Sequence, residues 1–158
     1  GELKKMHEET RLPILVREGL LEALQNHAET IHLPNVEFND GLGVRLPVDV
    51  EHGLYRIAQE ALSNAKKHFP SHSERELHVS VSLRQDGPYT VLEVVDNGPG
   101  FDVAAETSKP ESFGLTRMME IAEGIKGHCT ITSQPGQGTR VRVTVPTQEK
   151  VAAREDRF

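Results

Sequence analysis

Four polar side chains recur at helical spacing near the middle of the chain. They are Glu60, Asn64, Lys67 and His68, and the last three follow Glu60 by 4, 7 and 8 residues, so that a helix would carry them on one side. The carboxylate of Glu60 can accept a proton or orient a water molecule. The amide oxygen of Asn64 is a hard ligand that suits Mg²⁺, and the Lys67 ammonium is a point charge that suits phosphate. A solvated helix face with an ordinary charge pair has the same pattern, so the spacing alone leaves both interpretations open.

A glycine-rich segment at 96–101 (Asp-Asn-Gly-Pro-Gly-Phe) follows a run of apolar residues. Gly98 and Gly100 allow a tight turn and a close approach of the backbone to a ligand. The carboxylate of Asp96, at the end of a predicted strand, can accept a hydrogen bond from an exocyclic amine such as that of adenine. The same residue types are typical of a plain turn, which stays as the alternative.

Two further segments have the composition of ligand-binding loops. Gly114-Leu115 opens a predicted helix after a polar stretch, and the N–H groups at a helix N-terminus attract phosphate. Segment 135–139 (Pro-Gly-Gln-Gly-Thr) precedes the last predicted strand and presents the hydroxyl group of Thr139. A simple helix start and a hairpin turn are the structural alternatives for these two segments.

The elements between these residues predict a sheet with helices on one side. Apolar residues recur at helical spacing in three segments and form strand-like patterns in five others. One apolar face per helix favours two layers. Asp49 is expected to cap the second helix, and residues 102–113, which lack periodicity, are expected to form a loop. The predicted helices are 14–31, 49–68 and 115–125, and the predicted strands are 36–38, 77–83, 89–95, 129–131 and 141–145.

The composition excludes several classes of protein. The 158 residues include 24 acidic and 18 basic ones, a net charge of −6, and a negative chain without a basic block binds nucleic acid poorly. No apolar run approaches the ~18 residues of a membrane span, and no signal or transit peptide is recognised. The single cysteine, Cys129, excludes an intramolecular disulfide and cysteine-based zinc sites. These features predict one globular domain in a reducing cytoplasm.

The order of the four motifs resembles the ATP-binding catalytic domain of bacterial sensor histidine kinases, part of the wider superfamily with DNA gyrase and MutL-type ATPases. The segment YRIAQEALSNAKKH is similar to the subgroup that includes nitrate sensors and DesK-type thermosensors, whose asparagine box begins with glutamate, as it does here at Glu60. The resemblance covers residues 14–146. It implies an α+β fold, namely a two-layer α/β sandwich of the Bergerat type with a mixed sheet of about five strands backed by three main helices.

The resemblance also implies that the domain binds Mg-ATP and transfers the γ-phosphate to a histidine. Asn64 would hold Mg²⁺, and Glu60 beside it would be the catalytic residue that positions a water molecule, the metal or the nucleophile. Asp96 would accept a hydrogen bond from the adenine amino group, with Thr139 nearby, and residues 102–113 would be a mobile lid. The implied ATP-binding residues are Asn64, Lys67, His68, Asp96, Gly98, Gly100, Phe101, Gly114, Leu115 and Thr139.

The third predicted helix departs from the family pattern. Related segments often read GLxGMRER, whereas here Arg117 replaces the second glycine and Met119 and Ile121 replace basic residues. We expect altered lid contacts or altered packing near the phosphates, with an effect on nucleotide affinity.

The phospho-acceptor histidine of the family is not recognised in this chain. It lies on a long helical hairpin in the family, and His7-Glu8 matches it only superficially, because Pro13 follows too soon for a long helix. We expect a domain excised from a longer parent, monomeric and without robust autophosphorylation.

The predicted organisation is a linker or helix remnant at 1–13, the ATP-binding catalytic domain at 14–146 and a polar tail at 147–158. The implied partners are the dimerisation and histidine-phosphotransfer domain of the parent chain and a downstream response regulator. Neither nucleic acid nor direct membrane contact is expected, whether or not the parent is membrane-anchored.

Two other functions fit the same residues. One is an anti-sigma serine kinase, a small free-standing member of the superfamily, which the length suits but the QEALSNAKKH segment does not. The other is a regulatory module that binds nucleotide, or has lost that ability, and acts through protein contacts. The departures in the third predicted helix favour the regulatory module over the serine kinase.

Overall fold

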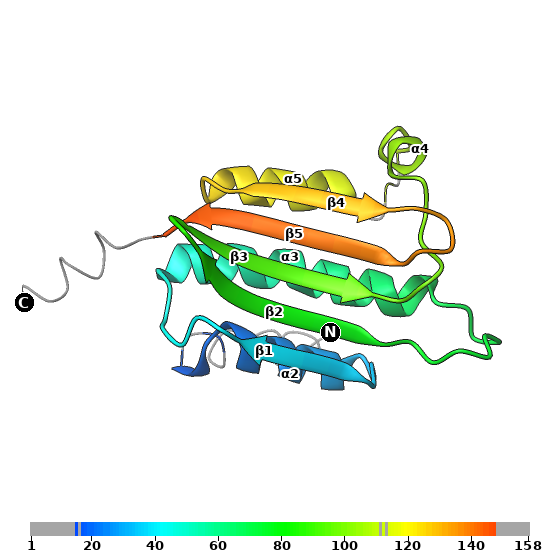
Figure 1. Ribbon diagram of the computed structural model, residues 1–158, viewed down its shortest axis with the longest axis horizontal. Coiled ribbons are helices and arrows are strands. Elements are labelled where there is room, and N and C mark those ends of the chain that lie inside the picture. The colour runs from blue at the N-terminus through cyan, green and yellow to red at the C-terminus, as the bar shows by residue number, and fades with distance from the viewer. Residues whose placement is uncertain (1–14, 16, 111, 113, 148–158) are drawn as a thin grey trace, which may run out of the picture.

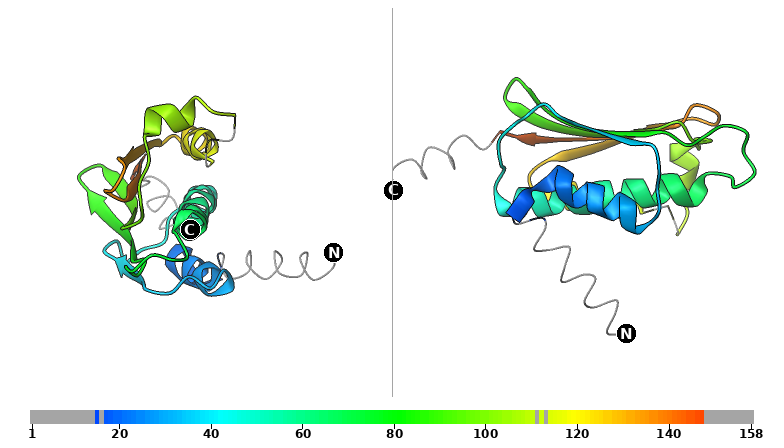
Figure 2. Two further views of the ribbon diagram at one scale, coloured as in Figure 1. Left: turned by 90° about the vertical axis from the view of Figure 1, so that its right-hand side faces the viewer. Right: turned by 90° about the horizontal axis from the view of Figure 1, so that it is seen from below.

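The computed structural model describes residues 15, 17–110, 112 and 114–147, which form one sheet with three longer helices on one face (Figures 1 and 2). The predicted N-terminal segment, with His7, and almost all of the predicted polar tail lie outside the described residues. The helices are α2 (Leu20–Thr30), α3 (Val48–His68), α4 (Val103–Thr107) and α5 (Leu115–Gly124), and the strands are β1 (Val36–Asp40), β2 (Val79–Asp86), β3 (Tyr89–Asp96), β4 (His128–Ser133) and β5 (Thr139–Pro146).

The sheet is mixed and has the strand order β1-β2-β3-β5-β4. β1 runs parallel to β2, whereas the other neighbouring strands are antiparallel. A parallel pair needs a crossover connection, which α3 supplies between β1 and β2. In the β3–β5 pair, Asp96 at the end of β3 lies opposite Thr139 at the start of β5. The register therefore brings two of the predicted site residues together at one end of the sheet.

The core lies between the sheet and the helices, with α3 at its centre. Leu54, Ile57 and Leu62 on the apolar stripe of α3 have no exposed surface. α2 packs along one side of α3 and α5 along the other (Figure 2). Gly53 permits close packing with the C-terminal end of α5, because a Cβ atom there would lie 2.8 Å from Cγ2 of Ile125, the C-cap residue of that helix. The predicted α+β sandwich, a mixed five-stranded sheet backed by three helices, is confirmed.

None of the helices in the described ranges combines the length and the apolar character that a membrane crossing needs.

The first long helix is shorter than the predicted segment 14–31. Gly19 has a φ of +99° and interrupts the helical backbone, so that α2 begins at Leu20. Arg45 lies beside this break. Its Nη2 donates to the backbone oxygen of Leu15 (3.0 Å), and its Nε and Nη2 donate to the carboxylate of buried Glu51 (2.9 and 2.7 Å). The apolar period continues across the glycine and therefore does not reveal the break.

Two other boundaries differ from the prediction. The segment 102–113, predicted as a loop, contains the short helix α4, where Oδ1 of Asp102 accepts the Ala105 backbone N–H (3.1 Å). No residue of α4 is buried, so an apolar period could not indicate it. α3 begins at Val48 after Pro47, and Asp49 is not the N-cap but lies in the first turn, where its charge favours the positive end of the helix dipole.

Candidate nucleotide-binding site

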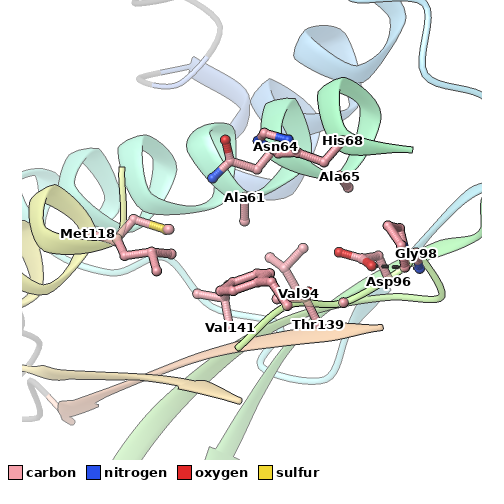
Figure 3. A pocket seen from close by; sticks show the side chains of 14 residues that line it. Ala61, Asn64, Ala65, His68, Val94, Asp96, Gly98, Met118, Thr139 and Val141 are labelled. Carbon is pink, nitrogen blue, oxygen red and sulfur yellow. Dashed lines mark hydrogen bonds between the residues drawn. The ribbon is translucent and has the colours of Figure 1, made fainter. Parts of the chain in front are cut away.

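A cavity of about 240 Å³ lies between the C-terminal half of α3 and the end of the sheet. Ala61 and Ala65 of α3 border it on one side, and Val94 and Val141 of the sheet border it on the other (Figure 3). A largely apolar cavity with a few polar groups is typical of a small-molecule site. Of the predicted site residues, it is lined by Asn64, His68, Asp96, Gly98, Gly100, Phe101, Leu115 and Thr139, and it is not lined by Glu60, Lys67 and Gly114.

Asp96 brings a carboxylate to this cavity. Its Oδ1 accepts the backbone N–H of Gly98 at 2.8 Å (Figure 3). Burial raises the pKa of the Asp96 carboxyl, and hydrogen bonds from the backbone of Gly98 and Thr139 offset part of that rise. A carboxylate held in apolar surroundings is a strong acceptor for N–H donors of a ligand.

The two glycine-rich segments 97–101 and 134–138 contact each other through their backbones. The Gly136 N–H donates to the Pro99 oxygen at 2.5 Å. Gly100 has a φ of +70°, and a Cβ atom there would lie only 2.0 Å from the backbone oxygen of Gln134. Because no side chain fits in that space, glycine is required for the close approach of the two segments.

Ser133, at the end of β4, joins the same two segments and was not predicted as a site residue. Its Oγ accepts the Phe101 backbone N–H (3.0 Å), donates to the Gly138 oxygen (2.7 Å) and lies 3.0 Å from Oγ1 of Thr139. One signal could have identified it. Cys129 and Ile131 are the buried positions of β4, and the next position with the same orientation carries a hydroxyl group instead of an apolar side chain.

The residues of the predicted polar face of α3 do not all face the same environment: some line the cavity and one is exposed to solvent. Asn64 and His68 line the cavity, whereas Lys67 is exposed. Helix geometry explains the division, because Lys67 and His68 differ by about 100° around the axis, whereas Asn64 and His68 differ by about 40°. Burial lowers the pKa of the His68 imidazole, and the charge of Lys67 adds to that effect. His68 is therefore a neutral hydrogen-bonding group at neutral pH.

Glu60 contacts the start of α5 instead of the cavity. Gly114, the N-cap of α5, has a φ of +72°, and a Cβ atom there would lie 2.1 Å from Oε1 of Glu60. The carboxylate is thus packed against the end of the segment that links α4 to α5. On α5 itself, Leu115 and Met118 are buried and line the cavity.

The unusual residues of α5 lie away from the cavity lining. Arg117 is exposed, and Met119 and Ile121 pack against the core. The cavity therefore has its shape without direct contributions from these three positions.

Comparison with protein families identifies a match over most of the domain. The sequence model of the histidine kinase-, DNA gyrase B- and HSP90-like ATPases matches residues 49–149. This range contains all four of the motifs that carry the predicted site residues.

Several curated relatives are histidine kinases. The histidine-protein kinase/phosphatase DegS of Brevibacillus brevis is 35% identical over 133 residues, which are 81% of this chain and 32% of the relative. DegS of Bacillus subtilis is 44% identical over 103 residues, 65% of this chain and 26% of the relative. The sensor histidine kinase YhcY of Bacillus subtilis is 32% identical over 135 residues, 85% of this chain and 34% of the relative. The chain spans about a third of the length of these relatives.

A solved structure has the same fold. The histidine kinase domain of a blue-light-activated histidine kinase from Erythrobacter litoralis superposes with a TM-score of 0.67 at 17% identity, over 82% of this chain and 64% of that one. The family model covers more than half of the chain, and two of the relatives are more than 30% identical over more than four-fifths of it. The chain therefore belongs to the histidine kinase-, DNA gyrase B- and HSP90-like ATPase family, with sensor histidine kinases among its relatives.

Proposed function

We propose that the domain binds Mg-ATP in the cavity and donates the γ-phosphate to a histidine on a separate dimerisation hairpin of its parent, a sensor histidine kinase of a two-component system. The partly buried carboxylate of Asp96 in a largely apolar cavity supports this proposal most strongly. Asn64 lies across the same cavity on α3 (Figure 3). One end of the site thus suits a base with an amino group, and the other suits a phosphate chain with its metal.

The base would lie between α3 and the sheet. Asp96 accepts a hydrogen bond from the exocyclic amine, and Thr139 contributes its hydroxyl from the opposite strand. Gly98 and Gly100 keep the backbone close to the plane of the base, and Phe101 packs at the edge of the cavity. An apolar site with a precisely placed acceptor excludes water and fixes the orientation of the ligand.

The phosphates would lie near the end of α3 and the start of α5. The Asn64 amide suits Mg²⁺, which is usually held by few protein ligands together with substrate phosphates. The described ranges contain no group of three or more His, Cys, Asp or Glu side chains that could hold a metal ion. Bound Mg²⁺ would neutralise charge on the phosphates during transfer. Lys67, neutral His68, Gly114 and Leu115 are the further phosphate or ribose contacts that we propose.

Glu60 would act at the boundary between the bound phosphates and the incoming histidine. Its carboxylate lies against Gly114, at the end of the proposed lid. From there it can orient the attacking imidazole or a water molecule by accepting a proton.

The acceptor histidine would come from outside this domain. DegS and YhcY are histidine kinases about three times as long as the matched region, which supports a parent with its own dimerisation and histidine-phosphotransfer domain. A downstream response regulator would then receive the phosphate. We propose a cytoplasmic position for the domain, and weak ATP hydrolysis without robust autophosphorylation for the isolated chain.

The test is a calorimetric titration of the chain with ATP, with and without Mg²⁺, followed by incubation of the full-length parent with γ-labelled ATP. Mg²⁺-dependent binding and acid-labile phosphate on the parent would support the proposal. Binding without phosphate transfer would indicate the regulatory module, and acid-stable phosphate on an added protein would indicate the serine kinase. No binding by the folded chain would refute the nucleotide site.

A further inference from the structure

Ser133 lies at the centre of a small hydrogen-bond network beside the cavity. Three groups lie within hydrogen-bond distance of its Oγ: the Phe101 N–H, the Gly138 oxygen and the Thr139 hydroxyl. Thr139 lines the cavity, whereas Ser133 does not. Any effect of Ser133 on a bound ligand therefore has to pass through its neighbours.

The number of protons in this network determines the direction of each hydrogen bond. A serine hydroxyl has one proton to donate and two lone pairs to accept. The Gly138 carbonyl can only accept, so its 2.7 Å contact requires the Ser133 proton. The Phe101 N–H occupies one lone pair of Oγ. The contact at 3.0 Å between Oγ and Oγ1 of Thr139 is then a hydrogen bond only if Thr139 donates.

This assignment leaves only acceptor lone pairs on Thr139 for a ligand in the cavity. Asp96, the residue opposite Thr139 in the β3–β5 pair, is also an acceptor when ionised. Two acceptors at the same end of the cavity match a 6-amino purine, which offers two N–H donors. A 6-oxo purine would place an acceptor, O6, where the amino group of a 6-amino purine places its two donors, and its one N–H on that edge, at N1, could serve only one of the two acceptors.

From this we infer that Ser133 is a specificity-determining positioning residue, which orients the Thr139 hydroxyl as an acceptor and so selects 6-amino over 6-oxo purine nucleotides. The inference rests on the proposed function, because it concerns the base of the nucleotide that the cavity would bind. It goes beyond that function by assigning a role to a residue outside the cavity lining.

The experiment measures dissociation constants of the chain for ATP and for ITP, the 6-oxo analogue, by calorimetric titration with Mg²⁺. In Ser133→Ala the Thr139 proton is released and can turn toward a 6-oxo group. We expect the ratio of the ITP to the ATP dissociation constant to fall about 2- to 10-fold, the range of one neutral hydrogen bond. Ser133→Thr retains the hydroxyl and should restore the wild-type ratio.

Two further variants separate orientation of Thr139 from a general structural effect. In a Thr139→Val background there is no hydroxyl to orient, so adding Ser133→Ala should leave the ratio unchanged. Ser82→Ala, on the β2 face opposite the buried Val81, is the matched control and should alter neither constant.

The possible results distinguish this inference from the proposed function. If the wild type binds ATP but Ser133→Ala weakens ATP and ITP by the same factor, the inference is wrong and the proposed function stands. Equal binding of ATP and ITP by the wild type would overturn the inference as well. If the folded wild type binds neither nucleotide, the proposed function fails and the inference fails with it.

Discussion

Replacement of Asp96 by asparagine is expected to weaken ATP binding without weakening the fold. The side chain keeps its size, and its oxygen can still accept the Gly98 N–H that Asp96 accepts at 2.8 Å. The second carboxylate oxygen becomes an NH₂ group, which would meet the adenine amine as donor against donor. The variant therefore changes the charge and the hydrogen bonding of the cavity but not its packing.

The loss of affinity can be estimated from the hydrogen bond that disappears. A hydrogen bond to a charged group contributes about 1.5–3 kcal/mol, so the dissociation constant for ATP should rise about 10- to 150-fold.

The same substitution should not lower the stability of the fold, although it lowers the affinity for ATP. Burial raises the pKa of Asp96 in the folded protein. Because the pKa is higher in the folded protein than in the unfolded chain, ionisation of Asp96 lowers the free energy of unfolding at pH values above the unfolded-state pKa. This destabilisation disappears again as the pH falls through the folded-state pKa and below it. Asparagine has no such charge. At pH 7, the variant without nucleotide should therefore be at least as stable as the wild type.

Calorimetric titration with Mg-ATP and thermal unfolding without nucleotide test the two halves of this prediction. Asp86→Asn, at the exposed end of β2, serves as the matched control and should leave ATP binding unchanged. An unchanged ATP affinity in Asp96→Asn would refute the adenine contact. A large fall in melting temperature would instead show that the carboxylate mainly stabilises the fold.

Acid should also weaken ATP binding, because burial raises the pKa of Asp96 and protonation replaces its charged acceptor with a neutral carboxylic acid. Titrations at decreasing pH, down to the lowest pH at which the chain stays folded, should show this in the wild type and a much flatter dependence in Asp96→Asn. Gly100→Ala would place Cβ 2.0 Å from the Gln134 oxygen. A non-glycine residue in a left-handed backbone conformation costs about 1–2 kcal/mol, and the unfolding free energy of this variant should fall by more than that. Gly87 has a φ of +58° and open space where a Cβ atom would lie, so Gly87→Ala measures the backbone cost alone. Equal losses of unfolding free energy in the two variants would contradict the close contact between Gly100 and Gln134. Leu62→Ala removes a fully buried side chain from α3 and should lower the unfolding free energy in urea by about 2–5 kcal/mol; a loss well below that range would contradict its place in the core.

The layered fold could be predicted because periodicity reports burial. Leu54, Ile57 and Leu62 recur at helical spacing, and all three are fully buried. The break at Gly19 could not be predicted in the same way. It is associated with contacts of Arg45 with Leu15 and Glu51, which depend on how distant segments meet. The short helix α4 buries no residue and therefore leaves no period in the sequence.

The cavity lining was predictable to the extent that the candidate residues lie at the ends of recognisable elements. Asp96 ends β3 and Thr139 begins β5, and their pairing follows from the antiparallel register. Spacing along α3 was less informative, since it grouped exposed Lys67 with His68 of the cavity lining. The contacts of Ser133 join positions 32 and 5 residues away, and no local pattern records that they meet.

The contact between the two glycine-rich segments limits how the domain can be recombined. Gly100 leaves space for the Gln134 oxygen, and a Cβ atom at Gly138 would lie 2.2 Å from the backbone oxygen of Asp96. A segment with another length or backbone path would collide with its unchanged neighbour. Chimeras between this domain and other ATPases of the family should therefore take both segments from one parent. For library design, 97–101 and 134–138 behave as a single exchangeable cassette although more than thirty residues of chain separate them.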